Sequence, residues 1–502
     1  MKRLIELIDL INKHKIKQLD VIGLSNDTSA PQRLYNIISE QNIETDKEAA
    51  ALLAKGSPRD LSYKRAKSKL LRRLINTVLF IDAKKAMYNN YQTAYYNCWK
   101  NFAAAKILVG KSANVNGNFL LAETLHIAEK YEFTELAMHI AKQLRYQYGG
   151  LEGKRKLFTQ YNEIYQKHKA IFEAESLVDE HYTRLITYFA ANRGKASELT
   201  KAAAESLREI DLSVLLTQFN SYQLHLRGRI IQLMALSGYE QKEKYIQACD
   251  EAIAFFKQKM DVNPNSIHVF MHNKIVCCIQ YLDYHEGKIA LKAAMEQSTS
   301  NTHNWFLDHY YSMMLSLRFG HYEEAYESFE LLDGNKKLKN QTDQITEGIS
   351  VARAYFHYLA AIGKVRESAT TNFNLRTFLR KIPTFARDKG GLNIPILIVQ
   401  ILLLLQQEKY EEITTRLEAL KKYGGKYIKA QDRPRVTCFI NMLARISMSR
   451  FHKEATSRNT KKFRERLRQF PIEKYGQNYA IEIIPYEYLW EMIMEGLDNQ
   501  MH

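Results

Sequence analysis

Apolar residues recur every three or four positions along most of the chain, which is the spacing of one face of an α-helix. Two stretches, HYEEAYESFELL at 321–332 and KYEEITTRLEAL at 409–420, carry this pattern almost residue for residue. In register, Tyr322 matches Tyr410, and apolar residues follow both at spacings of three, four and three. A further apolar stretch and a short polar turn precede each copy, so the repeating unit is predicted to be an αα-hairpin.

Weaker copies of the pattern extend the repeat toward both ends of the chain. They begin near residues 133, 196, 245, 289, 365 and 451, and from residue 245 onward the intervals are 33–45 residues. Self-similarity at this period is typical of a helical-hairpin solenoid, because one hairpin can bury its apolar face only against its neighbours. The sequence therefore predicts an all-α fold built on an αα-hairpin solenoid.

The motif Gly320-x-Tyr322-x-x-Ala325-x-x-x-Phe329 resembles the second half of a tetratricopeptide repeat, and the resemblance covers about residues 115–460. It implies a superhelix of hairpins whose first helices line a concave groove that binds a peptide or a partner protein. Tyrosine can contact a ligand there while its hydroxyl stays hydrogen-bonded. Core packing is the alternative role for each of the candidate groove aromatics, which are Tyr310, Tyr311, Tyr355 and Tyr358.

The first 80 residues do not follow the repeat. Their apolar pattern predicts four helices, at Lys2–His14, Gln32–Gln41, Asp46–Lys55 and Leu61–Leu79. Thr45-Asp46-Lys47-Glu48 is a capping box, which supports the start of the third helix. We predict three domains, namely an N-terminal helical bundle over 1–85, a tetratricopeptide-like array over 86–470 and an acidic capping tail over 471–502.

The last helix of the predicted bundle is rich in cations. Six fall within ten residues: Lys64, Arg65, Lys67, Lys69, Arg72 and Arg73. A basic helix that follows another helix across a short turn is one arrangement by which proteins contact DNA or RNA. The alternative is a basic, solvated face on a helix that only packs against its neighbours.

The net charge of +17 is concentrated near the C-terminus. Between Arg433 and Arg468 there are eleven Lys or Arg residues and two acids, and the chain after Arg468 has one Lys and six acids. In one interpretation, a capping helix in the tail neutralises the basic helices through Glu482, Glu487, Glu491 and Glu495. In the other, the cations bind an anionic partner, either nucleic acid or an acidic protein segment. The densest cations are Arg458, Lys461, Lys462, Arg464, Arg466 and Arg468.

Motifs for catalysis are sparse. The sequence has no phosphate loop, no dinucleotide-binding glycine motif and no zinc-protease or serine-hydrolase signature, so no cofactor or metal is predicted. The segment Arg445–His452 resembles the Arg-x(4–6)-His motif of HEPN ribonucleases, in which an Arg and a His act together on a phosphodiester. A chance pairing in a basic stretch is the alternative, and we expect no enzyme activity.

The sequence indicates a cytoplasmic protein without membrane insertion. No signal peptide is visible, and the apolar run Leu392–Leu405 has fourteen residues, too few to span a bilayer, so it is predicted to be a buried helix. Five cysteines without a CxxC motif indicate buried, reduced thiols.

The predicted function is that of a non-catalytic protein–protein interaction scaffold or adaptor that binds a peptide or partner in the solenoid groove. The alternative is a nucleic-acid-associated regulator. In that case the basic N-terminal helix would contact DNA or RNA and the solenoid would sense a partner. The oligomeric state is left open by the sequence.

Overall fold

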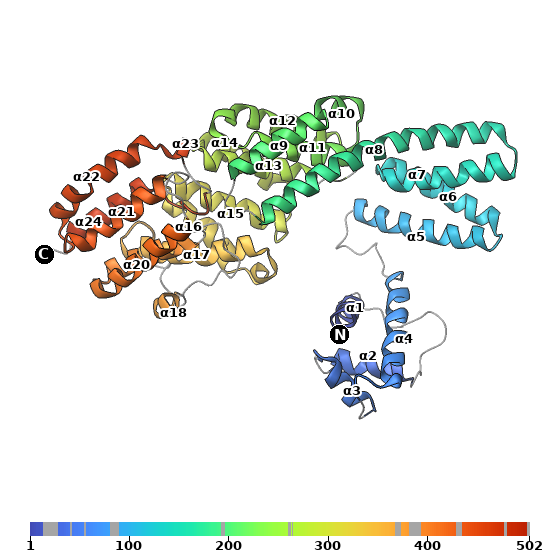
Figure 1. Cartoon of the computed structure of the whole chain (residues 1–502), viewed down its shortest axis with the longest axis horizontal. Helices are drawn as coiled ribbons and strands as arrows, with labels where there is room; N and C mark the ends of the chain where they lie inside the picture. Colours follow the sequence, from blue (N-terminus) through green and yellow to red (C-terminus); the bar gives the residue numbers. More distant parts are fainter. Residues whose placement is uncertain are drawn as a thin grey trace. The chain divides into compact units, whose positions relative to one another are not determined.

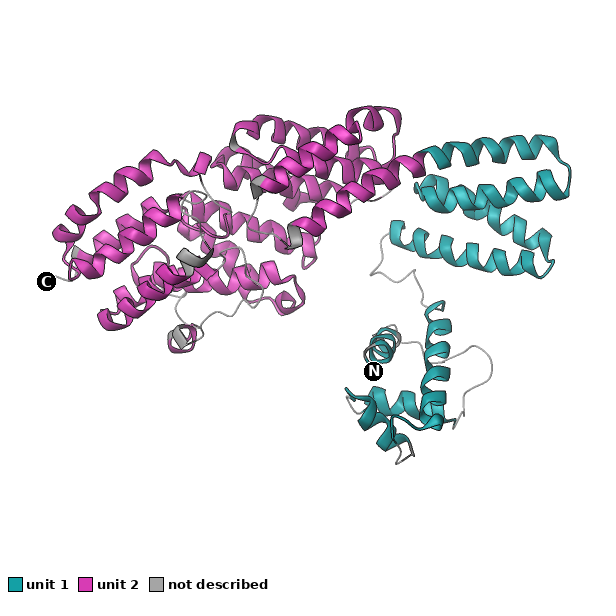
Figure 2. Cartoon of the chain, in the orientation of Figure 1, with its two compact units in different colours: residues 1–170 teal, residues 171–502 magenta. Residues whose placement is uncertain are grey.

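The computed structural model describes residues 1–13, 29–40, 43–54, 57–80, 90–191, 196–259, 263, 265–366, 373–380, 393–427, 434–475 and 479–498 (Figure 1). Over these residues the protein is all-α, with 24 α-helices and no strand. The chain divides into two compact units, residues 1–170 and 171–502 (Figure 2). The three-part division at 85/86 and 470/471 differs from this partition and stays a prediction.

The N-terminal bundle forms as the apolar pattern predicts. Its helices begin within two residues of their predicted starts, and His14, Gln41 and Lys55 lie outside the described residues. The capping box is present, because the backbone N–H of Thr45 donates to Glu48 Oε2 at 3.2 Å and that of Glu48 donates to Thr45 Oγ1 at 3.3 Å. The helices are α1 (Lys2–Lys13), α2 (Ala30–Glu40), α3 (Asp46–Ala54) and α4 (Leu61–Val78).

The rest of unit 1 is a second group of helices with its own apolar core. Aromatic rings from α5 and the α6–α7 turn pack edge-on there, with Tyr91 and Tyr95 against Phe133. The boundary between the two units falls within α8. The helices are α5 (Asn90–Gly110), α6 (Asn114–Lys130), α7 (Thr134–Arg145) and α8 (Arg155–Ala191), with a π-helical stretch at Tyr146–Leu151.

Unit 2 is a series of helices packed in neighbouring pairs, which confirms the all-α solenoid. The pairs α13–α14, α15–α16, α19–α20 and α21–α22 are consecutive helices that pack against each other. The helices are α9 (Ala196–Glu209), α10 (Leu212–Gln218), α11 (Tyr222–Ala235), α12 (Lys242–Lys257), α13 (Ser266–Gln280), α14 (Tyr284–Gln297), α15 (His303–Arg318), α16 (Tyr322–Asp333), α17 (Asp343–Ala361), α18 (Leu375–Arg380), α19 (Asn393–Gln406), α20 (Tyr410–Tyr427), α21 (Pro434–Met448), α22 (Lys453–Gln469), α23 (Ile472–Tyr475) and α24 (Tyr486–Asp498).

The two stretches that defined the repeat are equivalent second helices of their hairpins. Helix α16 begins at Tyr322 and α20 begins at Tyr410, the two residues matched in the sequence. The second helix predicted after Gly363 lies mostly outside the described residues. The matched apolar positions are all buried, namely Ala325, Phe329 and Leu332 in α16 and Ile413, Leu417 and Leu420 in α20.

The turns inside the hairpins repeat as closely as the helices. Two residues before α6, α7, α14, α16 and α20, the backbone is left-handed, with φ of 65° at Ser112, 57° at Glu132, 53° at Leu282, 76° at Gly320 and 57° at Glu408. The next residue then donates its N–H to the carbonyl five positions back, as in the 2.9 Å bond from residue 321 to residue 316. This Schellman bond satisfies a carbonyl that the helix end leaves unpaired.

The apolar run near residue 392 is the buried helix α19, in which every residue from Ile394 to Leu405 is buried. Among the described residues, no helix is both long enough and apolar enough to cross a membrane. All five cysteines are free and buried. Burial raises the pKa of the Cys277 and Cys278 thiols to about 12.

The left-handed backbone at Gly320 leads to a testable prediction. Gly320→Ala is expected to lower the free energy of unfolding by about 1–2 kcal/mol, because a Cβ disfavours positive φ. A Cβ there would otherwise meet only ordinary contacts, the nearest at 3.7 Å. The matched control is Gly334→Ala at the end of α16, where φ is −75°. Equal effects of the two substitutions in denaturant unfolding would contradict this account of the turn.

Candidate functional site

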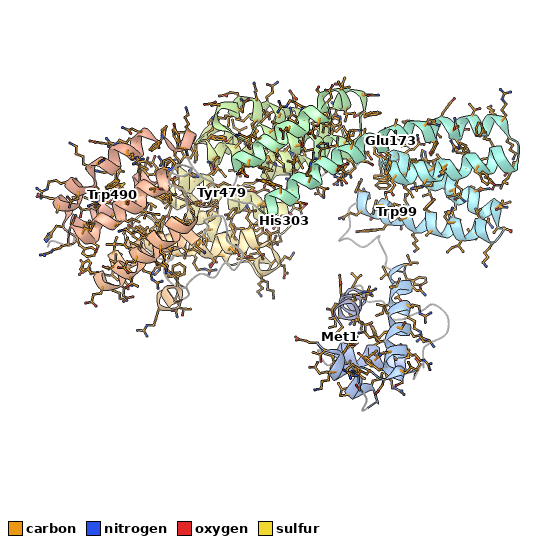
Figure 3. All side chains as sticks on the ribbon, in the orientation of Figure 1. Met1, Trp99, Glu173, His303, Tyr479 and Trp490 are labelled. Atoms are coloured by element: carbon orange, nitrogen blue, oxygen red, sulfur yellow. The ribbon has the colours of Figure 1, made fainter. Side chains whose placement is uncertain are left out.

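Residues 479–498, here called the C-terminal segment, lie against the first helices of several hairpins. The ring of Tyr479 packs edge-on against Tyr311 of α15, with centroids 6.4 Å apart. Its hydroxyl accepts a hydrogen bond from Gln344 Nε2 of α17 at 3.2 Å. Tyr486 stacks on Phe439 of α21 at 4.3 Å. The segment, marked in Figure 3 by Tyr479 and Trp490, therefore contacts α15, α17 and α21.

Arg435 of α21 anchors this segment by a buried ion-pair cluster. Its guanidinium donates to both oxygens of Glu482, at 2.8 and 3.1 Å, and to both oxygens of Glu487, at 2.6 and 2.9 Å. A fifth bond of 2.6 Å goes to the carbonyl of Phe470. Burial disfavours the charged guanidinium, but Glu482 and Glu487 outweigh it and raise the pKa of Arg435 above its ordinary value.

A second arginine, Arg318 at the end of α15, is buried in the same region. Burial lowers the pKa of Arg318 to about 10, with Glu482 opposing the shift and Arg435 adding to it. Glu482 is itself fully buried and thus compensates part of the charge of two arginines. The acids of the tail accordingly neutralise particular buried cations, which is narrower than the general neutralisation of basic helices expected from the sequence.

The four candidate groove tyrosines are buried in unit 2. Tyr355 donates its hydroxyl to the carbonyl of Pro395 at 3.1 Å. Tyr310 packs so closely on Gly348 that a Cβ there would lie 2.6 Å from the hydroxyl oxygen. Tyr311 lies under Tyr479, and burial raises its pKa to about 12. Tyr358 is equally enclosed. Core packing, the alternative role considered for these side chains, therefore describes them in this structure.

The densest basic stretch forms the exposed side of α22. Arg464 is half-buried and donates to the carbonyl and hydroxyl oxygens of Ser457. Glu487 and Glu495 of the C-terminal segment pair with Arg435 and Lys364 rather than with these cations. In the part of the chain that the structure describes, no carboxylate pairs with the other five. These residues, the α22 face, are Arg458, Lys461, Lys462, Arg466 and Arg468.

A second exposed basic surface lies on α4. Lys67 is only half-exposed and pairs with Asp46 at 2.6 Å. Burial raises the pKa of Asp46, but hydrogen bonds from Lys67 and Tyr63 outweigh it and lower the pKa to about 2. Arg73 is half-buried. The remaining cations point away from the bundle core and have no carboxylate partner among the described residues. They form the α4 face: Lys64, Arg65, Lys69 and Arg72.

The two residues of the ribonuclease-like motif lie in different surroundings. The guanidinium of Arg445 covers the ring of Phe463 at 5.7 Å, while His452 is exposed at the start of α22. Among the described residues, no hydrogen bond or ion pair joins Arg445 to His452. The arrangement gives the arginine a packing role that involves no histidine.

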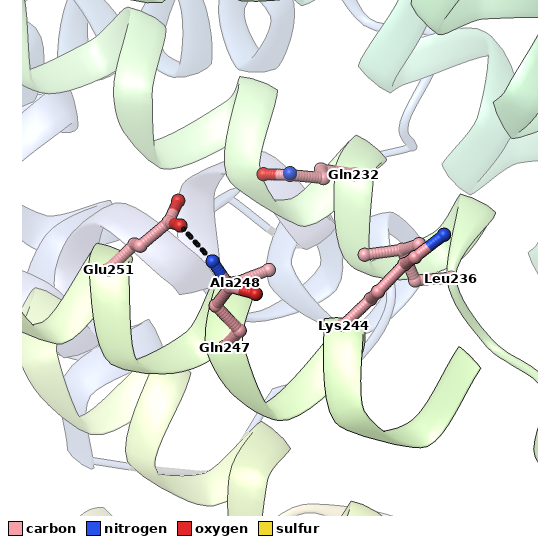
Figure 4. Close-up of a pocket in the computed structure, with 6 residues that line it drawn as sticks. All are labelled: Gln232, Leu236, Lys244, Gln247, Ala248 and Glu251. Carbon is pink, nitrogen blue, oxygen red and sulfur yellow. Dashed lines mark hydrogen bonds between the residues drawn. The ribbon is translucent and has the colours of Figure 1, made fainter.

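Two small hollows lie in the described surface of unit 2. Figure 4 shows one of about 190 Å³ between α11 and α12, where Gln247 Nε2 donates to Glu251 Oε1 at 3.0 Å. Another, of about 200 Å³, lies between α24 and the residues that follow α15 and α17. Sites for small organic ligands usually enclose about 300–1,000 Å³. The two basic faces are thus more prominent than either hollow as candidate binding surfaces.

The structure also assembles a cluster that the sequence analysis does not single out. His268 and His272 lie one turn apart on α13, and Asp308 of α15 lies beside them. The four-residue spacing of the histidines was the only signal in the sequence, since Asp308 is brought there by the fold. Comparison of the chain with protein-family models, curated proteins and solved structures gave no match. Its function has therefore to be inferred from its own residues.

The Arg435 cluster predicts a large effect of a single substitution. Arg435→Leu is expected to lower the free energy of unfolding by about 3–5 kcal/mol, because it leaves Glu482 buried without its main partner. Lys364→Ala removes an exposed partner of Glu495 and should cost under about 1 kcal/mol. Chemical denaturation of both variants measures the difference. Similar losses would show that the buried cluster is not what holds the C-terminal segment.

Proposed function

We propose that the protein is a non-catalytic interaction scaffold, in which tetratricopeptide-like helical hairpins bind an acidic segment of a partner protein. One observation carries the proposal: the array already holds an acidic helical segment of its own chain through the buried Arg435. Residues 479–498 place carboxylates on Arg435 and aromatic rings on Tyr311 and Phe439. An amphipathic helix laid on a helical surface is a common mode of peptide recognition.

The α22 face is the open counterpart of this occupied surface. Its five cations lie on one exposed side of a helix, and none of them forms an ion pair with a described carboxylate, although Glu454 and Glu465 share that side. The neighbouring rings are covered by arginine, Phe463 by Arg445 and Phe470 by Arg466, so they are poorly placed to stack on bases. A carboxylate-rich protein segment fits this surface, and complementary charge would speed its association.

The proposal is tested by capture from a lysate of the natural host, with nuclease added and at low salt. The tagged full chain is compared with a triple variant, Lys461→Glu, Lys462→Glu and Arg466→Glu. We expect specific proteins with acidic segments to be recovered by the wild type. Their recovery should fall at least about tenfold with the variant, which corresponds to roughly 1.4 kcal/mol of binding free energy.

A matched control carries the same change of charge elsewhere in unit 2. Lys336, Lys337 and Lys339 are exposed near the end of α16, and their replacement by glutamate should leave recovery unchanged. An equal loss of recovered protein with the two variants would mean that net charge alone, and not the α22 face, explains the effect. Recovery that is unaffected by the α22 substitutions would refute the assignment of the binding surface.

A nucleic-acid-associated regulator is the second candidate, and the α4 face supports it. Four exposed cations follow one side of a helix in a bundle with its own core. Phosphate contacts of this kind make affinity fall steeply with salt. The observation concerns a different helix and a different ligand, so this candidate can fail while the scaffold proposal stands.

Fluorescence anisotropy with labelled duplex DNA and single-stranded RNA tests this candidate across a salt series. The variant Lys64→Glu, Arg65→Glu and Lys69→Glu should weaken binding. The slope of log affinity against log salt concentration should also become less steep, by about 0.9 for each DNA phosphate that the variant no longer neutralises. The control variant reverses Arg33, Lys47 and Arg59, exposed cations elsewhere in the bundle. Absence of binding by the wild type at low salt excludes the candidate.

A further inference from the structure

Three buried side chains in unit 2 converge on one point between consecutive first helices. They are His268 and His272 of α13 and Asp308 of α15, with exposed fractions of 5%, 7% and 0%. One potential ligand atom from each lies within 4.8 Å of the other two. The histidines are four residues apart on a helix, so both rings point to the same side.

The contacts within the cluster leave one group unexplained. His272 Nε2 lies 2.7 Å from Asp308 Oδ1, and the Ser298 hydroxyl donates to the other oxygen of Asp308. His268, by contrast, has a buried Nδ1 with no hydrogen-bond partner in the described part of the chain. An unpaired buried nitrogen is unfavourable for folding, and a leucine would fill the same place without that loss. Packing alone therefore does not account for a histidine at this position.

We propose that His268, His272 and Asp308 bind a divalent transition-metal ion of the zinc type. Two imidazoles and one carboxylate form a donor set that suits such ions, whereas calcium and magnesium prefer oxygen ligands. Metal–ligand bonds of about 2.0–2.2 Å in a tetrahedral site separate the ligand atoms by roughly 3.3 Å. The 2.7 Å pair and the 4.8 Å limit bracket this value, so small side-chain movements complete the site.

The neighbouring groups fit the role of supports for such a site. Ser298 holds the oxygen of Asp308 that His272 does not contact, which fixes the plane of the carboxylate. Tyr311 packs edge-on against the His272 ring at 5.4 Å and limits its rotation. Three protein ligands leave a fourth position for water or another donor. The ion would join α13 to α15 and so connect two successive hairpins of the array.

Zinc binding to the tag-free full chain tests the inference. The protein is stripped with a chelator, titrated with zinc in competition with a chromophoric chelator, and analysed for metal by mass spectrometry. We expect one ion per chain and a higher melting temperature with zinc. Cobalt substitution should give the visible absorption of a tetrahedral site with nitrogen and oxygen ligands.

His268→Leu separates the metal site from a structural role. Because the buried Nδ1 has no protein partner among the described residues, the variant should fold with unchanged or raised stability in the absence of metal. Its zinc affinity should fall at least about 100-fold, more than the loss of an outer partner of a metal ligand. His285→Ala, at an exposed histidine in α14, is the matched control and should bind zinc as the wild type does.

Three outcomes would overturn the proposal. The first is a wild type that retains no zinc at micromolar concentration. The second is a His268→Leu variant, folded by circular dichroism, that binds zinc as tightly as the wild type. The third is a thiolate charge-transfer band in the cobalt form, which would place the ion on the buried cysteines.

Discussion

The buried charge of Arg435 determines where the C-terminal segment lies in unit 2. A guanidinium removed from water is unfavourable by several kcal/mol unless carboxylates and hydrogen bonds replace its hydration. Here Glu482, Glu487 and the carbonyl of Phe470 replace that hydration. Phe470 caps the C-terminal end of α22, and both glutamates lie in the chain that follows it. If the C-terminal segment left α21, the guanidinium of Arg435 would stay buried without its two carboxylate partners. The face of α15 and α21 that carries Tyr311 and Phe439 is therefore occupied by the chain itself.

The hairpins beneath that segment owe their regularity to local rules. Apolar residues at helical spacing form each pair of helices, and a left-handed residue followed by a Schellman bond closes each turn. Only some turns use glycine. Glu408 and Leu282 adopt the same backbone despite their Cβ atoms, which shows that packing of the two helices, rather than the turn residue, determines the connection. The repeat is consequently easier to see in the backbone than in the sequence.

Features set by neighbouring residues could be predicted from the sequence. The capping box at Thr45, the equivalent starts of α16 and α20 and the buried helix α19 all follow from spacing within a few turns. The environment of Tyr311 could not, since Tyr479 lies far along the chain and no periodicity specifies which segment covers a helix face. The same holds for Asp308 beside His272, and for the separation of basic residues into a buried Arg435 and an exposed α22 face.

The distribution of charge links these observations to binding. Over half of the net charge lies within 36 residues, yet three of the six acids that follow pair with Arg435 or Lys364, and none of the six forms an ion pair with the α22 face in the described part of the chain. If the acids had paired with the cations of α22, the surface would be close to neutral. Because they do not, the exposed cations raise the local concentration of anionic ligands over a distance of about 8–10 Å at physiological salt. The chain thus holds its own acidic segment at a buried arginine and keeps a separate basic surface, the α22 face, exposed.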